Sequence, residues 1–131
     1  MGKSEIIDCK GRDGMSRSFL FDIERQGSLA FVRVHIPGGD WDHVFELTLD
    51  VGNRARVILM NNLGMLEYAG LGIPDEAIIF ASKILGRKVI SNTKNFVAGN
   101  CRQLNATKVW ERLRVQGRAV YDMGLDIYLT K

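Results

Sequence analysis

Two closely spaced glycines followed by the start of a helix form the pattern with the clearest chemistry in this chain. Gly70 and Gly72 lack a Cβ, so the backbone can adopt positive φ angles there and a ligand can approach it closely. Pro74 suits the first turn of a helix, and Asp75 and Glu76 suit the positive end of the helix dipole. Backbone N–H groups at such a position can bind phosphate. A plain tight turn into a helix would have the same sequence, so the glycines alone leave both interpretations open.

The segments before this turn must position it, and their periodicity predicts strands. Alternating apolar residues over short runs, separated by turn residues, favour an antiparallel meander. The expected strands cover residues 18–23, 29–36, 43–50 and 54–60. The nearly continuous apolar run of the last one favours a central strand that is covered on both faces.

After the turn, an apolar stripe predicts a helix over residues 74–85, which ends at Gly86. A strand at 88–92 follows, and an Asn- and Gly-rich loop at 93–102 comes next. Strands at 118–122 and 126–130 should close the chain as a hairpin.

A second helix is expected between that loop and the hairpin. Asn105 can N-cap a helix over residues 106–116, and Gly117 can cap its C-terminal end. Trp110 falls on the apolar stripe of this helix, so a core position is favoured over a role in ligand stacking.

These elements predict an α+β, or mixed α/β, fold: an antiparallel meander followed by helix, strand, helix and hairpin. The sheet should have about six or seven strands with two main helices packed on it. The 131 residues are expected to form a single domain. Residues 1–15 are interpreted as an N-terminal arm with room for one short strand.

Composition narrows the class of protein. Hydrophobic residues make up 46% of the chain and charged residues 25%, which is typical of a soluble globular domain. The net charge of +3 suits an anionic ligand, but positive and negative residues interleave, which argues against nucleic acid. Cys9 and Cys101 form no CxxC pattern, which favours a reducing compartment. The chain has neither an apolar run long enough for a membrane helix nor a signal peptide, so a cytoplasmic location is expected.

Few side chains suggest proton transfer, and no motif fixes a reaction. His35 and His43 could accept protons near pH 7, but neither has an evident local partner, so structural roles are favoured. Glu46 and Tyr121 could act on the proton of an amine and are left unassigned. The sequence has no HExxH motif, no Walker lysine and no Cys/His cluster, so zinc and NTPase functions find no support.

The element order resembles the C-terminal two-thirds of the GNAT-type N-acetyltransferase superfamily. In that family a meander's fourth strand leads into a [QR]-x-x-G-x-[GA] turn and the cofactor-binding helix. Residues 67–72 (EYAGLG) match both glycines, with Glu67 in place of Gln or Arg. The family's fourth helix often reads N-x-x-A-x-x-x-Y-E-K, which Ala106, Glu111 and Arg112 fit, with Trp110 in place of Tyr.

The resemblance implies that acetyl-CoA lies in a splay between the fourth and fifth strands. Its pyrophosphate would bind the backbone N–H groups of Gly70, Leu71 and Gly72, and Ala69 and Asn105 would complete the cofactor-binding set. The implied activity is transfer of the acetyl group to a small-molecule or peptide amine, with no metal. Tryptophan has no proton to give at neutral pH, so the family's general-acid role is not carried over and the catalytic residues are left unassigned.

Two alternatives stay open. The first is a non-enzymatic protein-interaction or assembly module of the same fold, of phage or mobile-element origin. Such a module could form a homodimer through the terminal hairpin or an exposed edge strand. The second is a nucleic-acid-binding α+β module, for which affinity should fall steeply with salt.

Overall fold

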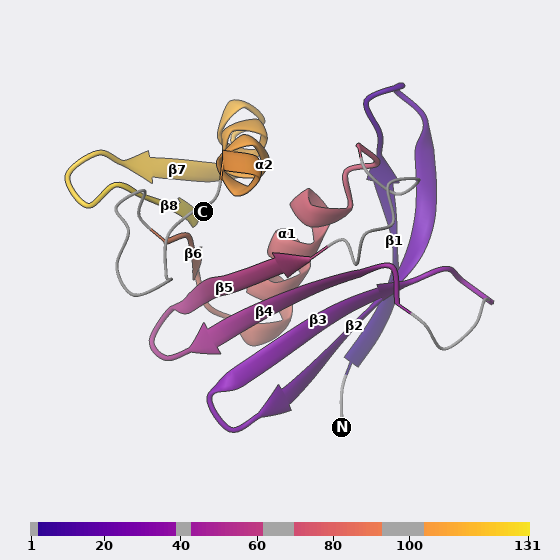
Figure 1. Ribbon diagram of the computed structural model, residues 1–131, viewed down its shortest axis with the longest axis horizontal. Coiled ribbons are helices and arrows are strands. Elements are labelled where there is room, and N and C mark those ends of the chain that lie inside the picture. Colours follow the sequence, from indigo (N-terminus) through magenta and orange to yellow (C-terminus); the bar gives the residue numbers. More distant parts are fainter. Residues whose placement is uncertain (1–2, 39–42, 62–69, 93–103) are drawn as a thin grey trace.

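The computed structural model describes residues 3–38, 43–61, 70–92 and 104–131. Within these residues, eight strands form one curled sheet that carries two helices (Figure 1). The α+β class is therefore confirmed. The strands are β1 (Lys3–Lys10), β2 (Ser16–Gln26), β3 (Leu29–His35), β4 (Phe45–Val51), β5 (Ala55–Asn61), β6 (Val89–Ile90), β7 (Ala119–Asp122) and β8 (Ile127–Thr130). The helices are α1 (Ile73–Leu85) and α2 (Leu104–Val115).

The strands follow the order β1-β2-β3-β4-β5-β6-β8-β7 across the sheet. The first five pair antiparallel in sequence order, as the expected meander requires. β6 returns parallel to β5, and β8 pairs antiparallel with β6. The terminal hairpin is confirmed, and its first strand, β7, forms the end of the sheet.

The expectation of six or seven strands was wrong, because most of the expected N-terminal arm is a strand. β1 pairs with β2 along its whole length, from Lys3 opposite Ile23 to Lys10 opposite Ser16. Its sequence shows little apolar alternation because one face is exposed, with Ile6 at 59% exposure, whereas Cys9 is fully buried on the other face. An edge strand of this kind carries a weak sequence signal.

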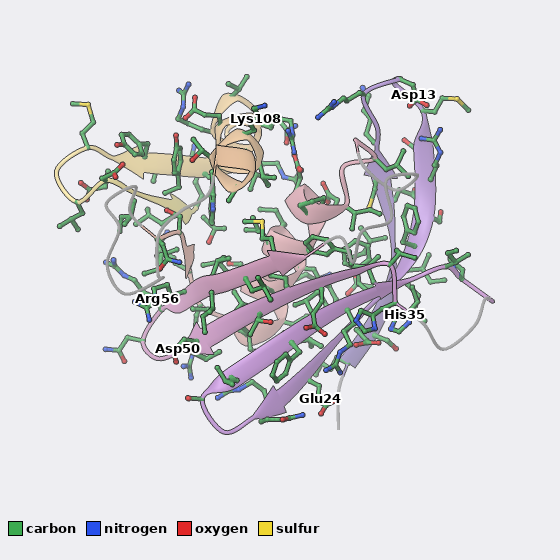
Figure 2. The ribbon with its side chains drawn as sticks, in the orientation of Figure 1. Asp13, Glu24, His35, Asp50, Arg56 and Lys108 are labelled. Carbon is green, nitrogen blue, oxygen red and sulfur yellow. The ribbon has the colours of Figure 1, made fainter. Side chains whose placement is uncertain are left out.

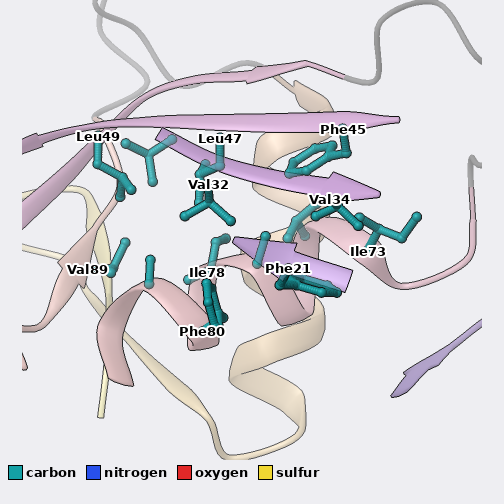
Figure 3. Close-up of a cluster of buried hydrophobic side chains, with 14 of the residues drawn as sticks. Phe21, Val32, Val34, Phe45, Leu47, Leu49, Ile73, Ile78, Phe80 and Val89 are labelled. Carbon is teal, nitrogen blue, oxygen red and sulfur yellow. The ribbon is translucent and has the colours of Figure 1, made fainter. Parts of the chain in front are cut away.

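The main core lies between α1 and one face of the sheet (Figure 3). The alternation predicted around residues 18–23 is confirmed, since Phe19, Phe21 and Ile23 are buried. Phe21 meets Phe80 of α1 edge to face, with ring centroids 5.7 Å apart. This packing anchors α1, and so the glycine turn before it, to the centre of the sheet.

The expectation that residues 54–60 form a strand covered on both faces was wrong. Ile58 and Leu59 of β5 are 39% and 49% exposed. The register between β4 and β5 shifts at Thr48 and Leu49, which disturbs the simple alternation of faces. α1 packs on the opposite face of this part of the sheet, where Val57 is buried.

The second helix begins earlier than expected. α2 starts at Leu104, so Asn105 lies inside its first turn and is not the N-cap. Gly117 adopts a positive φ of 75°, and its N–H donates to Arg114 O at 3.0 Å, which confirms the predicted C-terminal cap. Trp110 is fully buried, as predicted, and stacks on Tyr128 of β8 with ring centroids 5.9 Å apart.

Candidate functional site

The turn before α1 has the backbone geometry that its glycines predicted. Gly70 and Gly72 adopt positive φ angles of 73° and 82°, and Gly72 is the N-cap of α1 with no capping side chain. The N–H groups of Gly70, Leu71 and Gly72 donate to no residue within the described part of the chain. Three donors at the positive end of a helix are therefore available to an anion.

The end of β1 packs directly on this turn. The Arg12 N–H donates to Gly70 O at 2.8 Å. A Cβ placed on Gly72 would lie 2.4 Å from Lys10 O, and a Cβ on Gly11 would lie 3.2 Å from Gly70 O. Figure 2 labels Asp13 at the tip of the β1–β2 hairpin. The glycines therefore serve close packing between two backbones, a role that the sequence did not show.

The cationic side chain of Arg12 lies beside the turn at Gly70–Gly72. A Cβ placed on Gly70 would lie 3.3 Å from Arg12 Cδ and 3.4 Å from its Nε, so the arginine side chain lies over the glycine. Arg12 is exposed and forms no ion pair with a described residue. Its guanidinium has the geometry and charge to bind a phosphate beside the backbone donors.

The two acidic residues lie in the first turn of α1, as the sequence predicted, and each also binds an arginine from a distant segment. Asp75, which is 5% exposed, accepts Arg112 Nε and Nη2 at 2.9 and 2.8 Å. Glu76 accepts both terminal nitrogens of Arg118 at 2.7 and 2.9 Å. Both pairs are bidentate, and the hydrogen bonds raise the pKa of each arginine. The carboxylates thus join α1 to α2 and to the start of β7, and their charges are balanced near the turn.

A buried thiol lies beneath this charged cluster. Cys9 of β1 is fully buried. Burial, followed by the negative charges of Glu76, Asp75 and Asp8, raises its pKa to about 12. The thiol is therefore protonated at neutral pH and packs as a small apolar side chain.

The predicted cofactor-binding residues are only partly brought together. Gly70, Leu71 and Gly72 form one turn at the start of α1. Asn105 lies in the first turn of α2, and Arg112, two turns further on, reaches α1. Ala69, Glu67 and the expected loop at 93–102 lie outside the described residues. Across the described segments, no group of His, Cys, Asp and Glu could hold a metal ion.

His35 has a partner on a neighbouring strand, and His43 has one three residues further along the chain. His35 Nε2 lies 2.7 Å from Asp22 Oδ2, and His43 Nε2 lies 3.4 Å from Glu46 Oε2. Glu46 also accepts Arg33 Nε at 3.0 Å. Strand pairing brings His35 to Asp22 and Arg33 to Glu46, so the local sequence could not show these two contacts. These side chains form a polar row on the face of the sheet that α1 does not cover.

Neither of the helices in the described chain is long and apolar enough to cross a membrane. Comparison with protein-family models, with curated proteins and with solved structures finds no match to this chain.

The contact between Lys10 and Gly72 leads to a prediction about stability. A Gly72→Ala substitution should lower the free energy of unfolding by about 2 to 4 kcal/mol, because it adds a strained positive φ and an overlap with Lys10 O. Gly27→Ala is the matched control, since Gly27 also has a positive φ but has open space around it. The control should cost only about 1 kcal/mol in urea unfolding. Equal costs for both variants would contradict the packing role.

Cys9 leads to a prediction about alkaline pH. The folded-state pKa of about 12 lies above the ordinary value of 9.0, so the native state holds the proton more tightly than the unfolded state. This contribution to stability is fully present below pH 9.0 and falls as the pH rises toward 12. Relative to a Cys9→Ala variant, the wild type should lose about 1.4 kcal/mol of unfolding free energy per pH unit in that window. Urea unfolding across the window measures it, and parallel pH profiles would contradict it.

Proposed function

We propose that this chain is a GNAT-like acyl-CoA-binding protein that transfers an acetyl group from acetyl-CoA to a small-molecule or peptide amine. The observation that carries the proposal is a parallel strand pair that stops pairing after two residues, in the same unit as the glycine turn and its helix. The order of elements from β2 to β8 also matches the order on which the resemblance rests.

The parallel ladder between β5 and β6 is short. β5 meets β6 at Ala55 opposite Val89 and at Arg56 opposite Ile90, and β6 then ends while β5 continues to Asn61. Beyond the ladder, the described link between the two segments is a side chain: Asn92 Nδ2 donates to Val57 O at 2.8 Å. Peptide groups of β5 beyond Val57 lie outside the β5–β6 ladder, and an extended pantetheine arm could pair with them.

The residues at the turn suit the pyrophosphate of such a ligand. Gly70, Leu71 and Gly72 would donate backbone N–H groups, which need no side-chain reorganisation. Arg12 would add a charge-assisted hydrogen bond from the side of β1. Asp75 and Glu76 would oppose an anion less than free carboxylates do, because arginines already pair with both.

The chemistry requires little from the protein beyond orientation. Acetyl-CoA supplies a thioester, and direct attack of an amine nitrogen on its carbonyl carbon breaks the carbon–sulfur bond and releases the CoA thiol. Holding the two substrates together accounts for much of the rate of such a reaction. Trp110 is buried and takes no part in proton transfer, and we assign no described residue as the catalytic base.

Thermal and urea unfolding with acetyl-CoA test the proposal. Saturation at 100 times the dissociation constant should stabilise the wild type by about 2.7 kcal/mol. Arg12→Gln should weaken binding about tenfold, because it removes one charge-assisted hydrogen bond of about 1.5 kcal/mol. Arg25→Gln is the matched control, since Arg25 is an exposed arginine at the far end of β2 that binds Gly27 O, and it should bind like the wild type.

The absence of stabilisation by any acyl-CoA would overturn the proposal and leave the non-enzymatic assembly module as the better interpretation. If Arg12→Gln and Arg25→Gln lost affinity equally, acetyl-CoA would be attracted by the general positive charge of the protein and would not bind a specific site at the turn.

A further inference from the structure

Three turns that are far apart in the sequence meet at one end of the sheet. They connect β2 to β3, β4 to β5 and α1 to β6, and the tips of the two hairpins lie next to each other in Figure 1. Val51 N, at the end of β4, donates to Ser28 O of the first turn at 2.7 Å. Ala55 N, at the start of β5, donates to Lys88 O of the third turn at 2.9 Å. The three turns therefore form one continuous surface.

Exposed cations gather on this surface. The first residue of β1 is opposite Ile23 of β2, which places it on the same face as the residue two positions beyond Ile23. Further cations come from the β4–β5 turn and from the α1–β6 turn. The basic end, as we call this surface, consists of Lys3, Arg25, Arg54, Arg87 and Lys88, which are all exposed.

The charges of the basic end are not balanced by carboxylates. Within the described part of the chain, none of its five side chains forms an ion pair. Arg25 Nη2 and Lys88 Nζ donate to backbone carbonyls, each at 3.1 Å, and Arg87 donates to Gly52 O. A carbonyl group carries no net charge, so these hydrogen bonds orient the cations and leave their charge in place.

The acidic residues closest to the basic end already have cationic partners. The pairs are Glu5 with Lys83 at 2.9 Å, Glu24 with Arg33 at 3.3 Å and Asp50 with Arg56 at 3.6 Å. Figure 2 labels Asp50 and Arg56 beside the basic end. The C-terminal end of α1 adds a partial negative charge of only about half an electron. Folding thus separates charges that interleave along the sequence.

We propose that the basic end binds the phosphate backbone of a nucleic-acid duplex without reading its sequence. From β1 to β6 the surface crosses five strand spacings of about 4.8 Å, or about 24 Å in all. A duplex carries about one phosphate per 1.7 Å of its axis, so a length of this size presents several phosphates to one side. Three of the five cations are arginines, whose planar guanidinium groups bind phosphate oxygens in pairs.

The composition of the three turns favours a duplex over other polyanions. Residues 24–28, 52–54 and 86–88 include no aromatic side chain on which an unpaired base could stack. They also include no large apolar side chain that could enter a lipid bilayer, and a basic surface needs a second anchor for stable membrane binding. Phosphate contacts alone remain, and these suit the regular backbone of a duplex.

This inference does not depend on acyl-CoA binding, because the two sites lie at opposite ends of β1. Lys3 begins this strand at the basic end, whereas Lys10 ends it in contact with Gly72.

Fluorescence anisotropy of a labelled DNA duplex, measured over a range of salt concentrations, tests the proposal. The slope of log affinity against log salt should be about −0.9 for each cation that contacts a phosphate, or about −4.5 for all five. The double variant Lys3→Gln/Arg54→Gln should reduce the slope to about −2.7 and weaken binding about 60-fold at 0.1 M salt. Lys10→Gln/Lys108→Gln is the matched control: it removes two exposed lysines outside the basic end and should bind like the wild type.

An RNA duplex of the same sequence identifies the source of the phosphates. Equal binding supports recognition of the backbone in general, and binding to one duplex alone names the partner. The absence of binding to both duplexes at low salt would overturn the proposal, and so would equal losses in the two double variants. Binding to phosphatidylserine vesicles in place of duplexes would assign the surface to a membrane and also overturn it. Thermal unfolding shows whether each variant is folded.

Discussion

Close packing between the backbone of Lys10 and Gly72 is the constraint on which the position of α1 depends. Any side chain at residue 72 would meet the Lys10 carbonyl, and the hydrogen bond from Arg12 to Gly70 fixes the turn against the β1–β2 hairpin. Because α1 also covers the main core, the hairpin, the turn and the helix are positioned together. β1, which the local sequence pattern did not predict as a full strand, is thus the strand that holds the candidate site in place.

Electrostatics completes the arrangement around this turn. Arg112 and Arg118 come from α2 and from the start of β7, and they bind the two carboxylates of the first turn of α1. These pairs tie the C-terminal part of the sheet to the helix and leave Arg12 as an exposed cation beside three backbone donors. The two arginines therefore join α1 to the C-terminal elements and also balance the carboxylates near the candidate site. This charge balance beside the exposed Arg12 is the physical basis of the acyl-CoA proposal.

Local requirements explain what the sequence predicted well. Gly72, Gly86 and Gly117 all adopt the positive φ angles expected of them, and α1 begins and ends within a residue of its predicted bounds. What the local sequence did not show depended on distant partners: β1 is a strand because β2 pairs with it, and Asp75 and Glu76 bind arginines 37 and 42 residues away. The number of strands and the partners at the site could therefore not be read from local patterns.

An NMR titration of ¹⁵N-labelled protein with CoA tests the central claim most directly, because it reports on the backbone donors themselves. We predict saturable chemical-shift changes for the amides of Gly70, Leu71 and Gly72 and for the Arg12 side chain, with β7 unaffected. CoA binding that shifts amides elsewhere and leaves this turn unchanged, or no shifts at any CoA concentration, would contradict the account.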